Sequence, residues 1–238
     1  MLMSATAELF QFTDTFIEKY MPDMVELGRS FVQPAFQPTT NFRKGMYSLD
    51  NLWDGLGAIA IEIPTMKYFF GKITMYPQMN RKAKDYILYF YQKHFPDREG
   101  LVRPYEPMKI ETDYNELVSL FNGRNYKEDY QILVRSVRDL GSAVPPLVNA
   151  YMNLSSTMMS FGTALNRPFG DVDETGILIT MQDIYAAKKE RHLQSYEVKN
   201  RLFKRLHFFG INKETTKIIG DKNKEPRRLF GRKNKKTE

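Results

Sequence analysis

The alternation of strand and helix between residues 24 and 94 constrains the fold of this chain more than any other feature. Strand patterns at 24–33 and 67–76 are each followed by the apolar stripe of an amphipathic helix, at 49–61 and 80–94. A strand that is followed by a helix and then by another strand usually joins its neighbour through a crossover connection. We therefore expect an α/β protein in which these strands are neighbours in one sheet.

The first of these strands contains the stretch Glu26-Leu27-Gly28-Arg29-Ser30-Phe31-Val32-Gln33-Pro34. Its apolar residues favour a half-buried sheet, and Pro34 ends the ladder because it has no N–H. Glu26, Arg29 and Ser30 place an acid, a guanidinium and a hydroxyl on the strand. A polar loop and a helix beginning near Ser48 follow, and a helix N-terminus attracts phosphate or carboxylate groups. This arrangement is a usual place for a ligand.

The remainder of the chain predicts more helices and a pair of strands. We expect helices at 13–20, 113–121 and 126–140, a helix starting at Pro146, and a last one from Asp183 to His192. The helices within about 111–141 are interpreted as an insertion, and the segment 95–110 as a loop. Strands are predicted at 157–164 and 175–181, joined by a loop at 165–174.

Composition excludes several classes of function. The chain has 238 residues and no cysteine, so disulfides, cysteine nucleophiles and thiolate metal sites are ruled out. His94, His192 and His207 lie far from other ligand types, and we predict no metal site. No apolar run reaches the ~20 residues of a membrane span, and the first residues lack the pattern of a secretory signal. We expect a cytoplasmic location.

Charge divides the chain into a body and a tail. From Glu197 onward there are 14 Lys/Arg against 5 Asp/Glu, so the net charge of +7 belongs to the tail. The near-neutral body argues against specific nucleic-acid binding. We predict a domain at 1–194 and a basic, amphipathic or disordered tail at 195–238. Such a tail can bind an anionic membrane surface at the inner face, or it can simply solubilise the protein or bind nucleic acid non-specifically.

Several stretches together resemble a known family. They are the 26–34 stretch, Leu52-Trp53-Asp54-Gly55-Leu56, Tyr68-Phe69-Phe70-Gly71-Lys72-Ile73, Val144-Pro145-Pro146-Leu147, Tyr151 and Phe161-Gly162-Thr163-Ala164. From about residue 9 to residue 192 the chain resembles the second half of an N-acetyltransferase (GNAT-like) fold. It is most similar to the bacterial hemolysin-like acyltransferases, which include the N-acyltransferases of ornithine-lipid and glycine-lipid synthesis.

The resemblance implies a fold and a reaction. The fold is a partial GNAT-like one, with a mixed central sheet flanked by helices. The reaction is transfer of a (3-hydroxy)fatty acyl group from acyl carrier protein to the amine of a small amino acid, with glycine favoured, in aminolipid synthesis. No cofactor is permanently bound, and the acyl-phosphopantetheine of the carrier protein or of coenzyme A is a cosubstrate. The segment 37–45 lacks the glycine-rich pyrophosphate loop of coenzyme-A acetyltransferases, which favours the carrier protein as donor.

The resemblance also implies roles for residues of the first strand. Glu26 is the base or orients the amine, Arg29 binds the acceptor carboxylate, and Ser30 donates a hydrogen bond. The alternative is that Glu26 and Arg29 form a structural ion pair. The backbone of Phe31 and Val32 is expected to hold the pantetheine arm.

Gln33 completes the expected cofactor-binding set on this strand, and Arg43 and Lys44 extend that set into the following loop.

Four further residues are candidates for acceptor binding. Asp50 and Trp53 lie on the helix after the loop, where they can equally be a first-turn acid and a core residue. Asp171 and Asp173, together with Glu174, can form a cation-binding or amine-binding patch in the loop at 165–174. The alternative is that this acidic group is an ordinary solvated turn.

The chain departs from the family at its start, since family members usually carry roughly another third of a domain before Leu9. We expect a truncated form, an artefact of the start site, or a missing half supplied from elsewhere. The competing hypothesis for function is therefore a non-catalytic, truncated protein that associates with membranes or with partners. The oligomeric state is not predicted.

Overall fold

The computed structural model describes residues 6–28, 31–37 and 48–192, apart from the side chains of Leu49 and Asp50. The strands are β1 (Phe10–Phe12), β2 (Met24–Leu27), β3 (Tyr68–Met75), β4 (Val102–Pro104), β5 (Met159–Asn166) and β6 (Val172–Thr180). The α-helices are α1 (Asp14–Lys19), α3 (Ser48–Glu62), α4 (Arg81–His94), α5 (Tyr114–Leu120), α6 (Tyr126–Asp139) and α7 (Pro146–Met152). Short 3₁₀ turns are η1 (Met21–Asp23), η2 (Pro34–Phe36), η3 (Arg167–Phe169) and η4 (Met181–Asp183), and residues 186–192 are helical.

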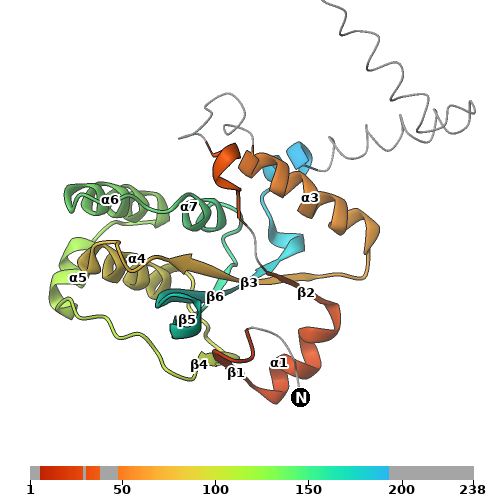
Figure 1. Cartoon of the computed structure of the whole chain (residues 1–238), viewed down its shortest axis with the longest axis horizontal. Helices are drawn as coiled ribbons and strands as arrows, with labels where there is room; N and C mark the ends of the chain where they lie inside the picture. Colours follow the sequence, from red (N-terminus) through yellow and green to blue (C-terminus); the bar gives the residue numbers. More distant parts are fainter. Residues whose placement is uncertain (1–5, 29–30, 38–47, 193–238) are drawn as a thin grey trace, which may run out of the picture. The chain divides into compact units, whose positions relative to one another are not determined.

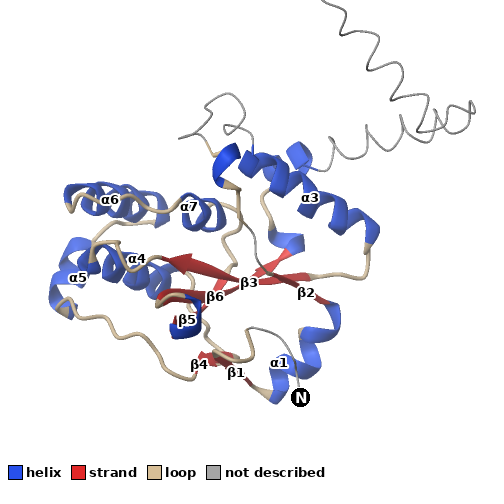
Figure 2. Ribbon diagram, in the orientation of Figure 1, coloured by secondary structure: helices blue, strands red, loops and turns tan. Residues whose placement is uncertain are grey.

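The centre of the fold is a mixed four-stranded sheet in the order β2-β3-β6-β5 (Figure 2). β2 is parallel to β3, and the connection between them contains α3. β3 pairs with β6, and β6 with β5, in the antiparallel sense. The predicted α/β class, with a mixed sheet flanked by helices, is confirmed, and it is compatible with a partial GNAT-like fold. A separate two-stranded sheet joins β1 and β4.

The two faces of the sheet are covered by different elements (Figure 1). Successive side chains of a strand point to opposite faces, so Phe69 and Phe70 enter two separate cores. Phe69 and Ile73 pack among apolar residues of α3, α4, α6 and α7. Phe70 packs with Phe16 of α1 and Phe161 of β5, whose ring centroids lie 5.7 and 5.9 Å from its own. We call these the helix face and the aromatic face.

Local sequence explains where the helices begin and end. The side chain of Asn80 accepts a hydrogen bond from the Ala83 N–H and caps α4. At the end of α6, Gly141 has a φ of 69°, and the N–H of Ser142 reaches the carbonyl of Val137. This is a Schellman ending, which requires a left-handed residue and so favours glycine. Within the described residues, no helix combines the length and the hydropathy that a membrane span needs.

The first strand is shorter than the sequence predicts. Its pairing stops at Leu27, so the prediction of a strand as far as Gln33 is wrong. Phe31 is not in a strand and is 66% exposed. Residue 28 is a glycine, which weakens strands, and the β propensity of Phe31 and Val32 counts only where a neighbouring strand covers them.

Three other boundaries also differ from the sequence prediction. The segment 95–110 was predicted as a loop but contains β4. This strand is too short to show the alternation of apolar and polar residues that would have predicted it. The loop predicted at 165–174 shrinks to a turn, in which Gly170 and Asp171 have φ angles of 83° and 54°. The last helix does not begin at Asp183 but at residue 186; Asp183 lies in η4 and accepts a hydrogen bond from Thr157 Oγ1 at 2.6 Å.

Candidate functional site

The candidate site lies where β2 leaves β3. Their register runs from Met24 opposite Tyr68 to Leu27 opposite Gly71. β3 continues to Met75 with β6 as its partner on the other side. Within the described residues, the stretch 72–75 has no strand partner on the β2 side. Such an edge carries backbone donors and acceptors that can pair with an extended, amide-containing chain.

Glu26 lies on the aromatic face at this divergence, because it stands opposite Phe70. The residue is exposed, and its Oε1 accepts a hydrogen bond from the Thr6 hydroxyl. Thr6 is 1% exposed and belongs to the turn before β1. The carboxylate is thus oriented by a group that sequence reasoning missed, since nothing in the sequence places residue 6 beside residue 26.

A buried ion pair lies next along the same face. Lys72 is the first residue of β3 beyond the paired segment, and its Nζ is 2.9 Å from Glu174 Oε2. The two side chains are 16% and 6% exposed. Glu174 also accepts a hydrogen bond from Asn166 Nδ2 at 3.0 Å. Sequence reasoning missed Lys72, and the apolar residues around it in β3 gave no signal for a buried charge.

The acidic patch predicted at 171–174 does not form, so that interpretation is wrong. Asp171 is exposed in the turn before β6. Asp173 lies within β6, and its carboxylate is 2.5 Å from Lys84 Nζ of α4 on the helix face. Glu174 points to the opposite face, toward Lys72. Alternation along the strand separates these acids, because they are not part of a loop.

Of the other predicted residues that the structure describes, Trp53 lies on the helix face, whereas Val32 and Gln33 follow β2. Trp53 packs edge to face against Tyr151 on the helix face, with ring centroids 5.3 Å apart. Burial raises the pKa of Tyr151 to about 12. The Val32 carbonyl accepts a hydrogen bond from Gln37 Nε2 at 2.9 Å, and Gln33 is exposed.

The other predicted site residues lie outside the part of the chain that the structure describes. They are Arg29, Ser30, Arg43, Lys44 and the side chain of Asp50.

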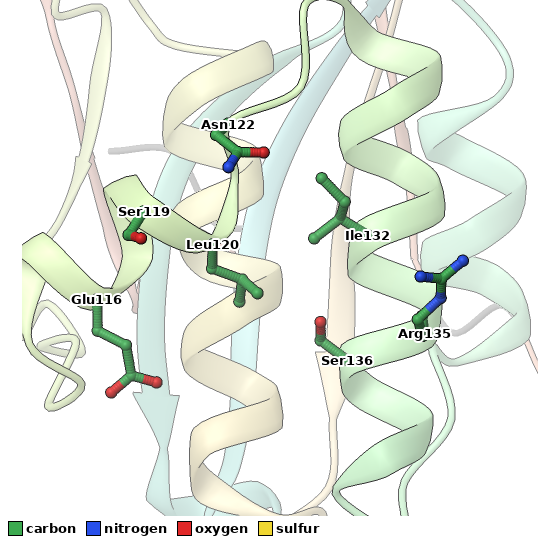
Figure 3. A pocket seen from close by; sticks show the side chains of 7 residues that line it. All are labelled: Glu116, Ser119, Leu120, Asn122, Ile132, Arg135 and Ser136. Carbon is green, nitrogen blue, oxygen red and sulfur yellow. The ribbon is translucent and has the colours of Figure 1, made fainter.

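A hollow of about 540 Å³ lies elsewhere, between α5 and α6 (Figure 3). Its lining residues are Glu116, Ser119, Leu120, Asn122, Ile132, Arg135 and Ser136. None of them belongs to the sheet. The Glu116 carboxylate already pairs with Lys82 at 2.6 Å, and this hydrogen bond lowers the pKa of Glu116. The hollow was not predicted as a site, and its lining residues are not adjacent in sequence to the unpaired edge of β3.

Comparison with known proteins identifies the relatives of the chain. It is 55% identical over 192 residues to a protein of Bacteroides thetaiotaomicron named glycine N(alpha)-acyltransferase. It is 54% identical over 192 residues to a protein of the same name from Phocaeicola vulgatus. The chain is a homologue of N-acyltransferases. The resemblance to N-acyltransferases predicted from the sequence is therefore confirmed.

The matched region covers 81% of this chain but only 57% and 59% of these two N-acyltransferases. The chain thus spans less than two thirds of their length. No protein-family profile matches the sequence, and no solved structure matches it.

The divergence of β2 and β3 offers what N-acyl transfer requires. Such a reaction needs a group that accepts the proton of the amine, and donors for the negative charge that develops on the thioester oxygen. An exposed carboxylate at Glu26 is suited to the first task. The backbone N–H groups along the edge of β3 are suited to the second, and they can also pair with an extended donor.

Proposed function

We propose that this chain carries the catalytic part of an N-acyltransferase that acylates glycine. The acyl group is a (3-hydroxy)fatty acyl chain, and its donor is the phosphopantetheine thioester of acyl carrier protein. The observation that supports the proposal is the 55% identity to a protein named for this reaction, over 81% of the chain. The position of Glu26 beside the unpaired edge of β3 is consistent with it.

The proposed chemistry is a direct transfer. The neutral amine of glycine attacks the thioester carbonyl carbon, an amide bond forms, and the carbon–sulfur bond breaks. The sulfur of phosphopantetheine leaves as a thiolate. The proton of the amine passes to Glu26 and from there to the thiolate, which is released as the thiol. Thr6 orients the Glu26 carboxylate through its hydroxyl. Backbone N–H groups between residues 72 and 75 stabilise the oxyanion in the transition state.

The pantetheine arm lies along the same divergence. Its two amides pair with the edge of β3 in place of a further strand, in the manner of β-augmentation. Phe31, Val32 and Gln33 follow β2 and supply the opposite wall. Arg43 and Lys44, which precede α3 in the sequence, bind the phosphate of the arm. The sequence segment that contains them has no glycine-rich pyrophosphate pattern, which favours acyl carrier protein over coenzyme A.

The product of this reaction is a lyso-aminolipid, so we place the reaction at the inner face of the membrane. The basic tail supports this location, because each basic residue near an anionic surface contributes about 1 kcal/mol of binding. Co-sedimentation with vesicles tests it. Binding to anionic but not to neutral vesicles at low salt is expected, and no binding to anionic vesicles would contradict it.

Reconstitution tests the reaction. The purified full chain is incubated with acyl-carrier protein or acyl-coenzyme A, and with glycine, alanine or ornithine. N-acylglycine, detected by mass spectrometry together with released thiol, is expected with the carrier protein as donor. A full-length relative serves as the positive control. Failure of this chain to form any N-acylglycine, while the relative does so, would overturn the proposal.

The alternative function is that of a non-catalytic protein that binds a partner or a membrane. The Arg29→Ala variant separates the two functions, because Arg29 is expected to contact the acceptor. A catalytic chain loses product formation in this variant while its thermal unfolding is unchanged. A non-catalytic chain forms no product, either as the wild type or as the Arg29→Ala variant.

A further inference from the structure

We infer that Lys72 binds the carboxylate of the acceptor amino acid and that Glu174 is its positioning residue. This inference rests on the proposed function, and it names the residues that select the acceptor. Its starting point is the place of Lys72 on β3, immediately beyond Gly71, the last residue of β3 that pairs with β2.

Lys72 and Glu26 share one face of the sheet. Glu26 stands opposite Phe70, and Lys72 is the next residue of β3 on that face. Strand spacings put the Cα atoms of such diagonal neighbours about 8 Å apart. Both side chains are long, so their charged ends can approach one small molecule that lies between them.

The ion pair does little to hold the fold together. Lys72 and Glu174 join β3 to β6, which already pair along the whole of β3. By contrast, Lys84 and Asp173 join α4 to β6, two elements with no ladder between them. Removing two charges from water is costly, and a buried ion pair seldom recovers that cost as stability. A buried pair between two strands that already share a ladder, at the edge of a candidate site, points to a role in binding.

Glycine fits between these two groups because of its charges. It is a zwitterion in which one carbon separates the carboxylate from the amine. The carboxylate binds the Lys72 ammonium, and the amino group is then directed toward Glu26. Glu174 of β6 fixes the position of the Lys72 ammonium, and Asn166 in turn donates a hydrogen bond to Glu174. An acceptor without a negative charge forfeits this interaction.

The test compares two acceptors in matched variants. Glycine carries a carboxylate, whereas glycinamide presents the same amine beside a neutral amide. Lys72→Met is expected to raise KM for glycine by about tenfold or more, because this is the effect of losing a charge-assisted hydrogen bond. The same variant is expected to change KM for glycinamide little. Lys84→Met, which breaks the buried pair on the helix face, is expected to keep the wild-type preference for glycine. Lys72→Arg is expected to restore part of that preference.

A second variant and a binding measurement keep the test decisive. Lys72→Met leaves Glu174 buried without its partner, so the double variant Lys72→Met/Glu174→Gln is measured as well; it removes both charges and is expected to fold. Glycine binding to the full chain is followed by saturation-transfer NMR, which needs no turnover. If the Lys72 variants raise KM for glycine and KM for glycinamide equally, the inference is overturned. Glycine binding that is unchanged in these variants also overturns it. In a further outcome, the wild-type chain binds glycine, loses this binding when Lys72 is replaced, and yet forms no N-acylglycine. That result overturns the proposed function and supports this inference.

Discussion

Asp173 and Glu174 are consecutive residues of β6, yet their carboxylates pair with lysines on opposite faces of the sheet. Asp173 lies 2.5 Å from Lys84 of α4, and Glu174 lies 2.9 Å from Lys72 of β3. The first pair fastens a helix to the sheet. The second lies at the divergence of β2 and β3, so one strand carries a structural pair and a candidate binding pair side by side.

The pair on the helix face should matter for stability. Asp173→Asn leaves Lys84 buried without a counter-charge, and we expect the free energy of unfolding to fall by about 3 kcal/mol. The double variant Asp173→Asn/Lys84→Met removes both charges and should recover much of that loss. Urea unfolding of the full chain measures both. A double variant as unstable as the single one would contradict this account.

Glu26 should matter for rate. A positioned general base typically contributes about 10²–10⁴-fold, so Glu26→Gln is expected to lower kcat by at least about 100-fold. Thermal unfolding should be unchanged, since Glu26 is exposed. Glu99→Gln, a change to an exposed acid outside the site, is the matched control. Similar rates for the two variants would remove Glu26 from the mechanism.

Asp129 should make stability depend on pH in acid. Burial alone would raise the pKa of this fully buried carboxyl, but hydrogen bonds from Lys93, His94 and the Gly123 N–H hold the pKa below its ordinary value. A lowered folded-state pKa stabilises the fold above the unfolded pKa, about 3.9, and this contribution is lost as the pH falls below it.

Urea unfolding of the wild type and of Asp129→Asn, measured from pH 7 to pH 3, tests this effect. The difference between the two free energies should be largest near neutral pH and should shrink below about pH 4. A difference that stays constant across the range would argue against the role of Asp129.

Tyr91 offers a stabilising substitution. Its hydroxyl is buried and has no hydrogen-bond partner among the described residues, and burial raises its pKa far above the ordinary value. Because a buried, unpaired hydroxyl is costly, Tyr91→Phe should raise the free energy of unfolding by about 1 kcal/mol. Tyr126→Phe is the control, since that hydroxyl donates to the Met152 carbonyl at 2.7 Å and its loss should destabilise. Opposite shifts in the melting temperature are expected.

Sequence patterns predicted those parts of the fold that depend on near neighbours. The apolar stripes of α4 and α6 repeat within one or two turns, and the helices predicted from them were confirmed. The Asn80 cap and the Gly141 ending depend on equally near neighbours. The length of β2 was not predictable in this way, because a strand ends where its partner diverges from it. The partner, β3, lies 41 or more residues further along the chain.

The candidate site depends mainly on contacts between distant residues. Glu26 was identified from its strand, but the Thr6 hydroxyl that orients it comes from a separate turn. Lys72 faces Glu174 only because of the register between β3 and β6, and a shift of one residue would have turned it to the helix face. The acids at 171–174 looked like a loop cluster for the same reason: composition does not show which side of a strand each residue takes.

The pairing of β3 with β6 also bears on how the chain is made. Thr74 and Glu174 stand opposite one another and are 100 residues apart in sequence. At typical rates of translation, roughly 5 to 20 s separate the synthesis of two such residues. During that interval β3 is present without its antiparallel neighbour, and contacts this distant form slowly in folding as well. The central strand therefore gains its antiparallel neighbour only after the end of the domain has been synthesised.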